Sequence, residues 1–186
     1  MEGLLRRFRT TSAKLREILK EKGCREQWAK VQAEYSSNPV SFIEECCWIF
    51  NPDLVPATIP FKLYGYQKDF VLKLHAKYRQ LDTSDKHHLL DEKTRQMGMS
   101  WLYMAFFLWA ILFDPGFSGF VMSYKEDLVD DGGAESTKDS LLGKLRFMYE
   151  HLPERFAGLL RFKYLRVSNH RTGAYLVGSS ANINAG

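Results

Sequence analysis

The feature that most constrains the fold is an apolar run from Trp101 to Phe113, which directly follows the polar stretch EKTRQMGMS. The run is 13 residues long, and a membrane-spanning helix needs about 20 residues. A helix that is apolar on every side has to be enclosed by other elements of its own domain. We therefore expect a core helix over Ser100–Phe113 and no membrane segment.

The segments on either side of this helix predict strands. Residues His87–Lys93 and Gly119–Ser123 flank it, and the sequence Asp-Pro-Gly at residues 114–116 ends it. Strand, helix and strand in this order form a βαβ unit with parallel strands and a right-handed crossover. Further helices are expected at Tyr66–Leu81 and Ser136–His151, and further strands at Leu160–Val167 and Gly173–Gly178, which predicts an α/β domain with a parallel central sheet.

Residues 1–50 have a different character and predict a helical N-terminal segment, with helices over Glu2–Lys22, Glu26–Tyr35 and Ser41–Trp48. Residues 51–60 contain three prolines and predict an irregular connector to the α/β domain of residues 51–186. The first 30 residues hold nine Lys and Arg against four Glu. This basic excess either contacts phosphates or a partner, or forms a solvated helix face.

The three cysteines are Cys24, Cys46 and Cys47. Their spacing matches neither a zinc site nor a disulfide framework, which favours a reducing cytoplasm.

The stretch before the apolar helix has the outline of a phosphate-binding loop. In the common pattern GxxxxGK[ST], backbone N–H groups and the lysine bind phosphates, and the hydroxyl binds Mg²⁺. Aligning the second glycine with Gly98 places Ser100 at the hydroxyl, Met99 at the lysine and Lys93 at the first glycine. Two of the four anchor positions therefore match.

The position of the loop favours an anion, because the start of a helix presents unpaired N–H groups and partial positive charge. Lys93 and Arg95 flank the turn and are candidates for the missing cation. The alternative is purely structural: Ser100 caps the helix, Met97 and Met99 pack in the core, and the two cations are solvated.

The stretch TRQMGMS resembles the variant phosphate loop of the large terminase subunit of tailed bacteriophages, the ATPase that packages DNA into the capsid. Many members read RQxGK[ST], and some place the lysine at the start of the loop. Lys93 matches that shifted lysine, and Arg95, Gln96, Gly98 and Ser100 match the RQxGxS frame. The methionine at position 99 departs from the commoner lysine.

Three further stretches resemble the same family in the expected order, over roughly Phe61–Gly186. The first, FKLYGYQKDFV, is similar to the adenine-recognising segment, with Gln67 at the glutamine. The stretch FVMSYKEDL resembles the strand and turn after the first helix. The stretch TGAYLVGSSANINAG resembles the strand that comes before the Walker B strand.

This resemblance implies a P-loop NTPase core of the RecA-like (ASCE) type, preceded by the helical segment and incomplete at its C-terminus. The Walker B acids, the coupling segment and the nuclease domain of the family are not found in these 186 residues. The parent protein is then expected to be an ATPase with a separate endonuclease domain. We expect the fragment itself to bind ATP and to hydrolyse little or none of it.

The resemblance also assigns roles to residues. Gln67 and Tyr64 are expected to orient adenine, and Ser100 to bind Mg²⁺ through ATP. The phosphates are assigned to the loop residues Lys93, Thr94, Arg95, Gln96, Met97, Gly98, Met99 and Ser100. The family also uses an arginine that reaches the nucleotide of a neighbouring subunit, and the candidates for it are Arg155, Arg161, Arg166 and Arg171.

The implied partners are double-stranded DNA, the portal of the procapsid, the small terminase subunit and further copies in a homo-oligomeric ring, within the host cell cytoplasm. Two alternatives remain open. One is a fragment of a helicase-like RecA-type ATPase, which shares the adenine segment. The other is a non-catalytic module that binds DNA or a partner through the basic N-terminal helix.

Overall fold

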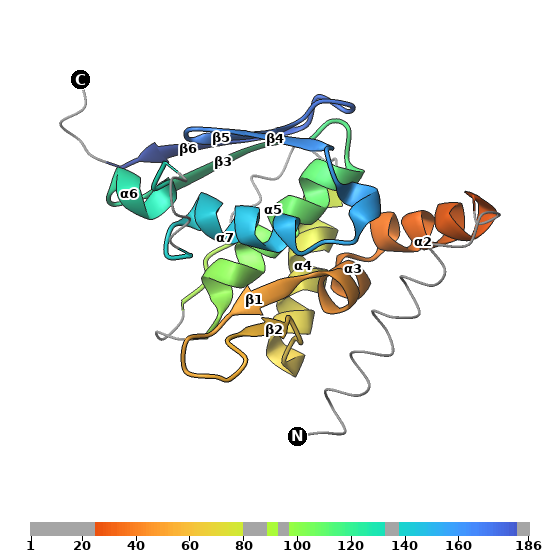
Figure 1. Ribbon diagram of the computed structural model, residues 1–186, viewed down its shortest axis with the longest axis horizontal. Coiled ribbons are helices and arrows are strands. Elements are labelled where there is room, and N and C mark those ends of the chain that lie inside the picture. Colours follow the sequence, from red (N-terminus) through yellow and green to blue (C-terminus); the bar gives the residue numbers. More distant parts are fainter. Residues whose placement is uncertain (1–24, 80–88, 93–96, 133–137, 182–186) are drawn as a thin grey trace.

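A computed structural model of the chain describes residues 25–79, 89–92, 97–132 and 138–181. A four-stranded sheet covers one side of a layer of helices, and a small two-stranded ribbon lies on the far side of that layer (Figure 1). The N-terminal helix predicted at Glu2–Lys22 lies outside the described residues.

The helices are α2 (Arg25–Ser37), α3 (Pro39–Cys46), α4 (Gly65–Arg79), α5 (Met99–Phe113), α6 (Glu126–Val129), α7 (Leu141–Glu150) and the 3-10 turn η1 (Glu154–Phe156). The strands are β1 (Trp48–Phe50), β2 (Thr58–Pro60), β3 (Ser118–Ser123), β4 (Leu160–Lys163), β5 (Arg166–Asn169) and β6 (Tyr175–Ser180). In the part of the chain described, no helix is both long enough and apolar enough to cross a membrane.

The predicted core helix is confirmed as α5, and ten of its 15 residues are buried. Polar groups attach it to both neighbouring layers. The indole N–H of Trp109 donates to the carbonyl of Tyr35 in α2 at 2.7 Å, and the amide of Asn169 in β5 donates to the carbonyl of Ile111 at 3.0 Å. The helix is therefore enclosed between the sheet and the other helices.

The sheet has the order β3-β6-β5-β4 and is mixed, because β3 and β6 are parallel while β5 is antiparallel to both of its neighbours. The expectation of a parallel central sheet therefore holds for the pair β3 and β6 but not for β4 and β5. The strand predicted over Leu160–Val167 is in fact a tight hairpin, with Leu165 at a φ of 55° in its turn. Short connections of this kind join antiparallel strands, whereas parallel strands need a long crossover.

The strand predicted at His87–Lys93 is not formed over residues 89–92, the part of it that the structure describes. The side chains of Leu89 and Leu90 are 39% and 93% exposed, so this segment does not pack into the core as a strand of the sheet would. The first strand of the predicted βαβ unit is thus missing among the described residues. Its helix and second strand are present as α5 and β3.

The predicted irregular connector also contains regular structure. Residues 51–57 are the loop of an antiparallel hairpin in which Trp48 pairs with Pro60 and Phe50 with Thr58. The preceding break between α2 and α3 is explained by Asn38, whose side-chain oxygen accepts hydrogen bonds from the amides of Val40 and Ser41 and so caps α3.

Gly178 in β6 marks the closest approach between the sheet and α6. A Cβ at this position would lie 2.4 Å from Cγ1 of Val129 and 3.4 Å from Cδ2 of Leu165. Val129 is fully buried, so it has little room to move. The absence of a side chain at residue 178 lets α6 pack directly on the sheet.

We predict that Gly178→Ala lowers the free energy of unfolding by about 1–3 kcal/mol, because a methyl group is forced into a filled core. Urea denaturation followed by tryptophan fluorescence measures the change. Adding Val129→Ala should recover part of the loss, since it removes the clashing methyl. Gly65→Ala is the matched control, because a Cβ there meets nothing within 4 Å; an equal loss in that control would contradict the packing explanation.

Candidate phosphate-binding site at the start of helix α5

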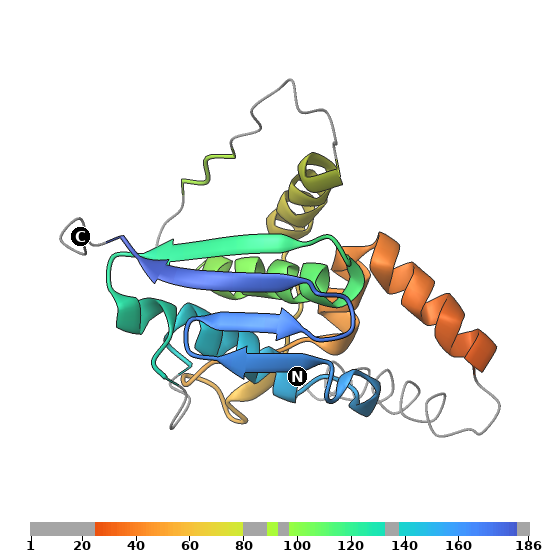
Figure 2. The same ribbon diagram turned by 90° about the horizontal axis from the view of Figure 1, so that it is seen from above.

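The start of α5 lies at the end of the sheet where β3 and β6 finish. Only residues 114–117 separate α5 from β3, so the helix runs back along the strand that follows it (Figure 2). A 15-residue helix is about 22 Å long and a six-residue strand about 20 Å. Ligands of open α/β sheets bind beyond the carboxyl ends of such strands.

The cap of α5 is Gly98, at a φ of 70° and a ψ of 7°, and no side chain caps the helix there. The first amides of a helix have no partner within it. Among the described residues, the amides of Met99, Ser100 and Trp101 find no hydrogen-bond acceptor and lie at the positive end of the helix dipole, which is the arrangement that binds anions. The loop residues Lys93, Thr94, Arg95 and Gln96 lie outside the described residues.

Met99 and Ser100 differ in their surroundings. Met99, the residue that replaces the common lysine, is 3% exposed and belongs to the core. Ser100 is the second residue after the cap and is half-buried. The packing of Met99 explains why an apolar side chain stands at this position, and it leaves any cation to be supplied by another residue.

The first turn of α4 is fastened to the loop through the carbonyl of Met97. The side-chain amide of Gln67 donates to it at 3.0 Å, and the hydroxyl of Tyr66 donates to it at 3.2 Å. A Cβ on Gly98 would lie 3.2 Å from Nε2 of Gln67. Together with the positive φ, this close approach requires glycine at residue 98.

Gln67 also caps its own helix. Its Oε1 accepts a hydrogen bond from the backbone N–H of Tyr64 at 3.0 Å, which is half of a capping box. The side chain is 2% exposed and bonded at both ends. It therefore sets the distance between the start of α4 and the loop.

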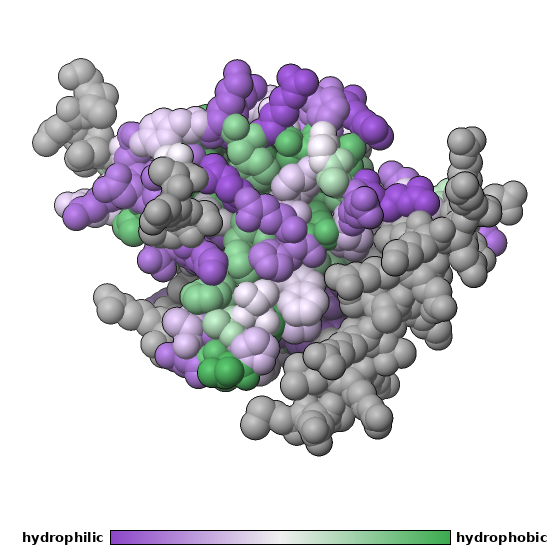
Figure 3. Space-filling model, viewed as in Figure 1, coloured by the Kyte–Doolittle hydropathy of each residue, from purple (hydrophilic) through white to green (hydrophobic). Residues whose placement is uncertain are grey.

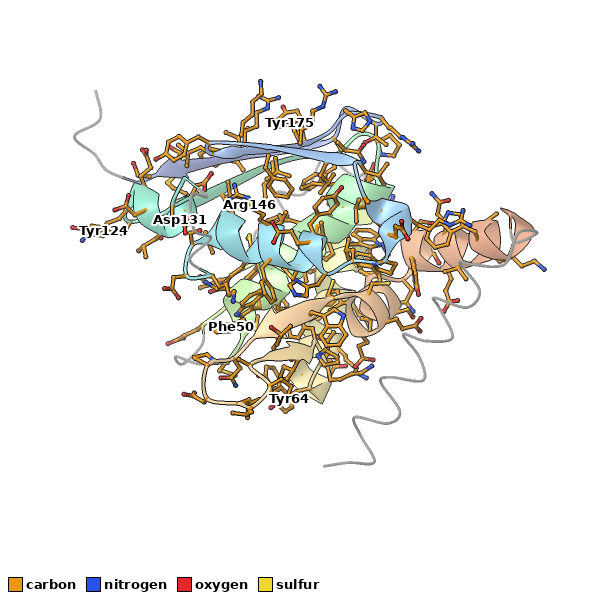
Figure 4. The ribbon with its side chains drawn as sticks, viewed as in Figure 1. Phe50, Tyr64, Tyr124, Asp131, Arg146 and Tyr175 are labelled. Carbon is orange, nitrogen blue, oxygen red and sulfur yellow. The ribbon has the colours of Figure 1, made fainter. Side chains whose placement is uncertain are left out.

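Tyr64 and Tyr66 present an aromatic surface beside the contact between α4 and Met97. Their rings are parallel within 6° with centroids 5.8 Å apart, and they are 69% and 44% exposed. Figure 4 shows Tyr64 at the outer surface of the helical layer. Exposed flat rings next to a buried amide are suited to stack on a planar ligand such as a nucleobase.

The segment before the loop is also tied to α5. The hydroxyl of Tyr103 donates to Oδ2 of Asp91 at 3.4 Å. Burial, together with the carboxylate of Asp91, raises the pKa of Tyr103 to about 12, so the phenol keeps its proton at neutral pH. This hydrogen bond holds residues 89–92, which precede the loop, close to α5.

The structure thus brings together Tyr64, Gln67, Met97 and Gly98, which the sequence had placed in one site, with Met99 and Ser100 following directly. It adds Tyr66, which the sequence interpretation missed. The candidate arginines are spread out: Arg155 is in η1 with its guanidinium over the ring of Trp28, Arg161 in β4, Arg166 in β5, and Arg171 exposed in the β5–β6 turn.

No protein-family model matches the chain, and no curated protein sequence matches it.

We predict that Gln67→Glu lowers the free energy of unfolding by about 1–3 kcal/mol at pH 8, because a carboxylate cannot donate to the Met97 carbonyl. The loss should shrink toward pH 5. Burial and the facing carbonyl raise the pKa of the new carboxyl above that of an unfolded glutamate, so its protonated, donating form favours the folded state as the pH falls.

Urea denaturation at both pH values, compared with wild type, measures this difference. Gln32→Glu on the exposed face of α2 is the charge-matched control and should show no such pH dependence. A loss for Gln67→Glu that is the same at both pH values would contradict the hydrogen bond to Met97.

Proposed function

We propose that this chain is the ATP-binding part of a viral DNA-packaging motor, the large terminase subunit, with a P-loop core of the RecA-like type. The observation that carries the proposal is the joint at Met97 and Gly98. There, an uncapped helix start and the Gln67 segment, both singled out by the sequence, are bonded to each other.

The phosphates of ATP bind at the start of α5. The amides of Met97, Gly98, Met99 and Ser100 bind its polyphosphate, Lys93 and Arg95 neutralise the charge, and Thr94 and Gln96 belong to the same loop. Ser100 supplies a hydroxyl for Mg²⁺ bound to ATP. Phosphoryl transfer depends mainly on positioning and electrostatics, so these groups hold and polarise the nucleotide.

The adenine base binds against the exposed rings of Tyr64 and Tyr66. Gln67 uses Oε1 for the Tyr64 amide and one N–H for the Met97 carbonyl. The second N–H of the same amide is the group that remains for a base edge. One buried side chain then contacts both the base and the loop that holds the phosphates.

The parent protein, in this proposal, couples ATP hydrolysis to translocation of double-stranded DNA into the procapsid, and cuts DNA with a separate nuclease domain. It works in the host cell cytoplasm with the portal and the small terminase subunit. In a homo-oligomeric ring, an exposed arginine such as Arg171 reaches the nucleotide of a neighbouring subunit. The family resemblance supports these partners and this assembly.

We predict that the purified chain binds a fluorescent ATP analogue in the presence of Mg²⁺, and that Lys93→Ala combined with Arg95→Ala weakens binding at least about tenfold, or ~1.4 kcal/mol, by removing two cations from the phosphates. Tyr64→Ala should weaken binding by a smaller factor. Fluorescence titration of each variant gives the Kd.

Lys30→Ala combined with Lys73→Ala, on exposed positions of α2 and α4, is the charge-matched control and should leave the Kd unchanged. The proposal fails if the Lys93 and Arg95 variants bind like wild type. If charge reversal in the first 24 residues then abolishes binding to DNA, the non-catalytic DNA-binding alternative is supported instead.

A further inference from the structure

The outer face of the four-stranded sheet is not covered by any described helix. Figure 1 shows α5 and α7 on the inner side of the sheet, with α6 at one end of it. Figure 4 places Tyr175 above the sheet, on the side away from the helices, while Arg146 of α7 lies beneath it. All-parallel sheets normally have both faces covered, whereas antiparallel sheets can leave one face to solvent. In this mixed sheet, the described residues leave the outer face open to a partner.

Half of this face is apolar. Phe120 and Met122 alternate with the buried Val121 along β3 and are 56% and 52% exposed. Val177 and Tyr175 are the outward residues of the neighbouring strand β6, and both are half-buried. Phe120 lies directly beside Val177 in the parallel register.

The other half is basic. Arg161 and Lys163 point outward from β4, and Arg166 points outward from β5. Lys163 and Arg166 are direct cross-strand partners, and like charges in this position destabilise a sheet. Each outward position of the four strands is described, and none is acidic; among the described residues, none of these three cations forms an ion pair.

One row of outward side chains across the sheet shows the change from the apolar half to the basic half. It runs from Phe120 to Val177, Arg166 and Lys163 on successive strands. Neighbouring strands lie about 4.8 Å apart, so the apolar strip over β3 and β6 is roughly 10 Å wide. This is the width of one α-helix with its side chains, about 10–12 Å. Figure 3 shows polar side chains along the upper rim of the molecule, where this sheet lies.

We propose that the outer face of the sheet binds an acidic amphipathic helix of a partner protein. The helix lies along β3 and β6 with its apolar stripe on Phe120, Met122 and Val177. A row of Asp or Glu on one flank faces the cations of β4 and β5. Binding relieves the repulsion between Lys163 and Arg166 and covers the apolar strip.

A helix fits this face better than the other candidates. Single-stranded nucleic acid stacks its bases on several exposed aromatic rings. On this face, Phe120 is one exposed ring, and Met122 and Val177 are aliphatic. The ring of Tyr175 has the guanidinium of Arg166 4.8 Å from its centre. The chain's own predicted amphipathic helix at residues 2–22 holds seven Lys and Arg against three Glu. Its charge has the wrong sign for a basic face.

The test uses a fluorescein-labelled peptide of about five helical turns, with leucines at helical spacing and a row of glutamates on one flank. A matched peptide carries lysine at each glutamate. Fluorescence anisotropy with the complete chain should show binding of the acidic peptide, and binding of the lysine peptide at least tenfold weaker.

Lys163→Glu combined with Arg166→Glu should weaken the acidic peptide at least tenfold and strengthen the lysine peptide. The control Lys30→Glu combined with Lys73→Glu makes the same charge change on α2 and α4 and should leave both affinities unchanged. Phe120→Ser combined with Met122→Ser should weaken both peptides, and it serves as the second test if the charge-reversed sheet fails to melt cooperatively.

The proposal is overturned if the acidic peptide does not bind, or if it binds the Lys163 and Arg166 variant as it binds wild type. Binding of a labelled oligothymidine that is lost in that variant, without binding of the acidic peptide, assigns the face to nucleic acid. Self-association that is lost with Phe120→Ser and Met122→Ser, again without peptide binding, assigns it to a second copy. None of these outcomes depends on nucleotide binding at α5.

Discussion

The burial of α5 determines the arrangement of the remaining elements. Each large apolar side chain removed from water contributes on the order of 1.5–3 kcal/mol, and this helix has apolar side chains in every direction. It therefore has to be covered by the sheet on one side and by α3, α4 and α7 on the others. The polar loop ends at the N-terminus of α5, so the first amides of this helix lie at the carboxyl edge of β3 and β6.

Features that depend on local sequence were predictable, and those that depend on distant contacts were not. The apolar run and the Asp-Pro-Gly stop define α5 without further information. The hairpin within Leu160–Val167 has no such signal, because its turn residues, Tyr164 and Leu165, include none of the Gly, Pro, Asn, Asp or Ser residues that usually mark a turn. Leu165 is held there by a hydrogen bond from its amide to the carboxylate of Asp130 and by one from the amide of Gly178 to its carbonyl.

The same distinction applies to the site. Gln67 and Gly98 were found from their sequence contexts, but their direct contact depends on how α4 packs beside α5, which spacing does not encode. Tyr66 was missed because an aromatic residue in the first turn of a helix usually packs or is solvated. Its hydrogen bond to Met97 spans 31 residues. A strand at residues 89–92 would likewise need a neighbouring strand edge, which no local pattern supplies.

The joint at Met97 has a further physical consequence. Its carbonyl accepts hydrogen bonds from Tyr66 and Gln67 in the first turn of α4, while the next residue, Gly98, caps the start of α5. A ligand that stacks on the tyrosines and draws on the Gln67 amide changes the bonds that hold Met97 in place. In the proposed function, recognition of a base and the position of the amides at the start of α5 are thus coupled through these two hydrogen bonds.

The outer face of the sheet and helix α5 lie on opposite sides of strand β3. Along β3, Phe120 and Met122 point outward, while Val121 between them points into the core that α5 occupies. Because alternate side chains of one strand share a backbone, a helix bound outside and a nucleotide bound at the start of α5 act on opposite sides of the same strand. Under the two proposals, β3 is the element shared by the outer face and the core around α5, and it is the route by which a bound partner and a bound nucleotide would influence each other without contact between the ligands.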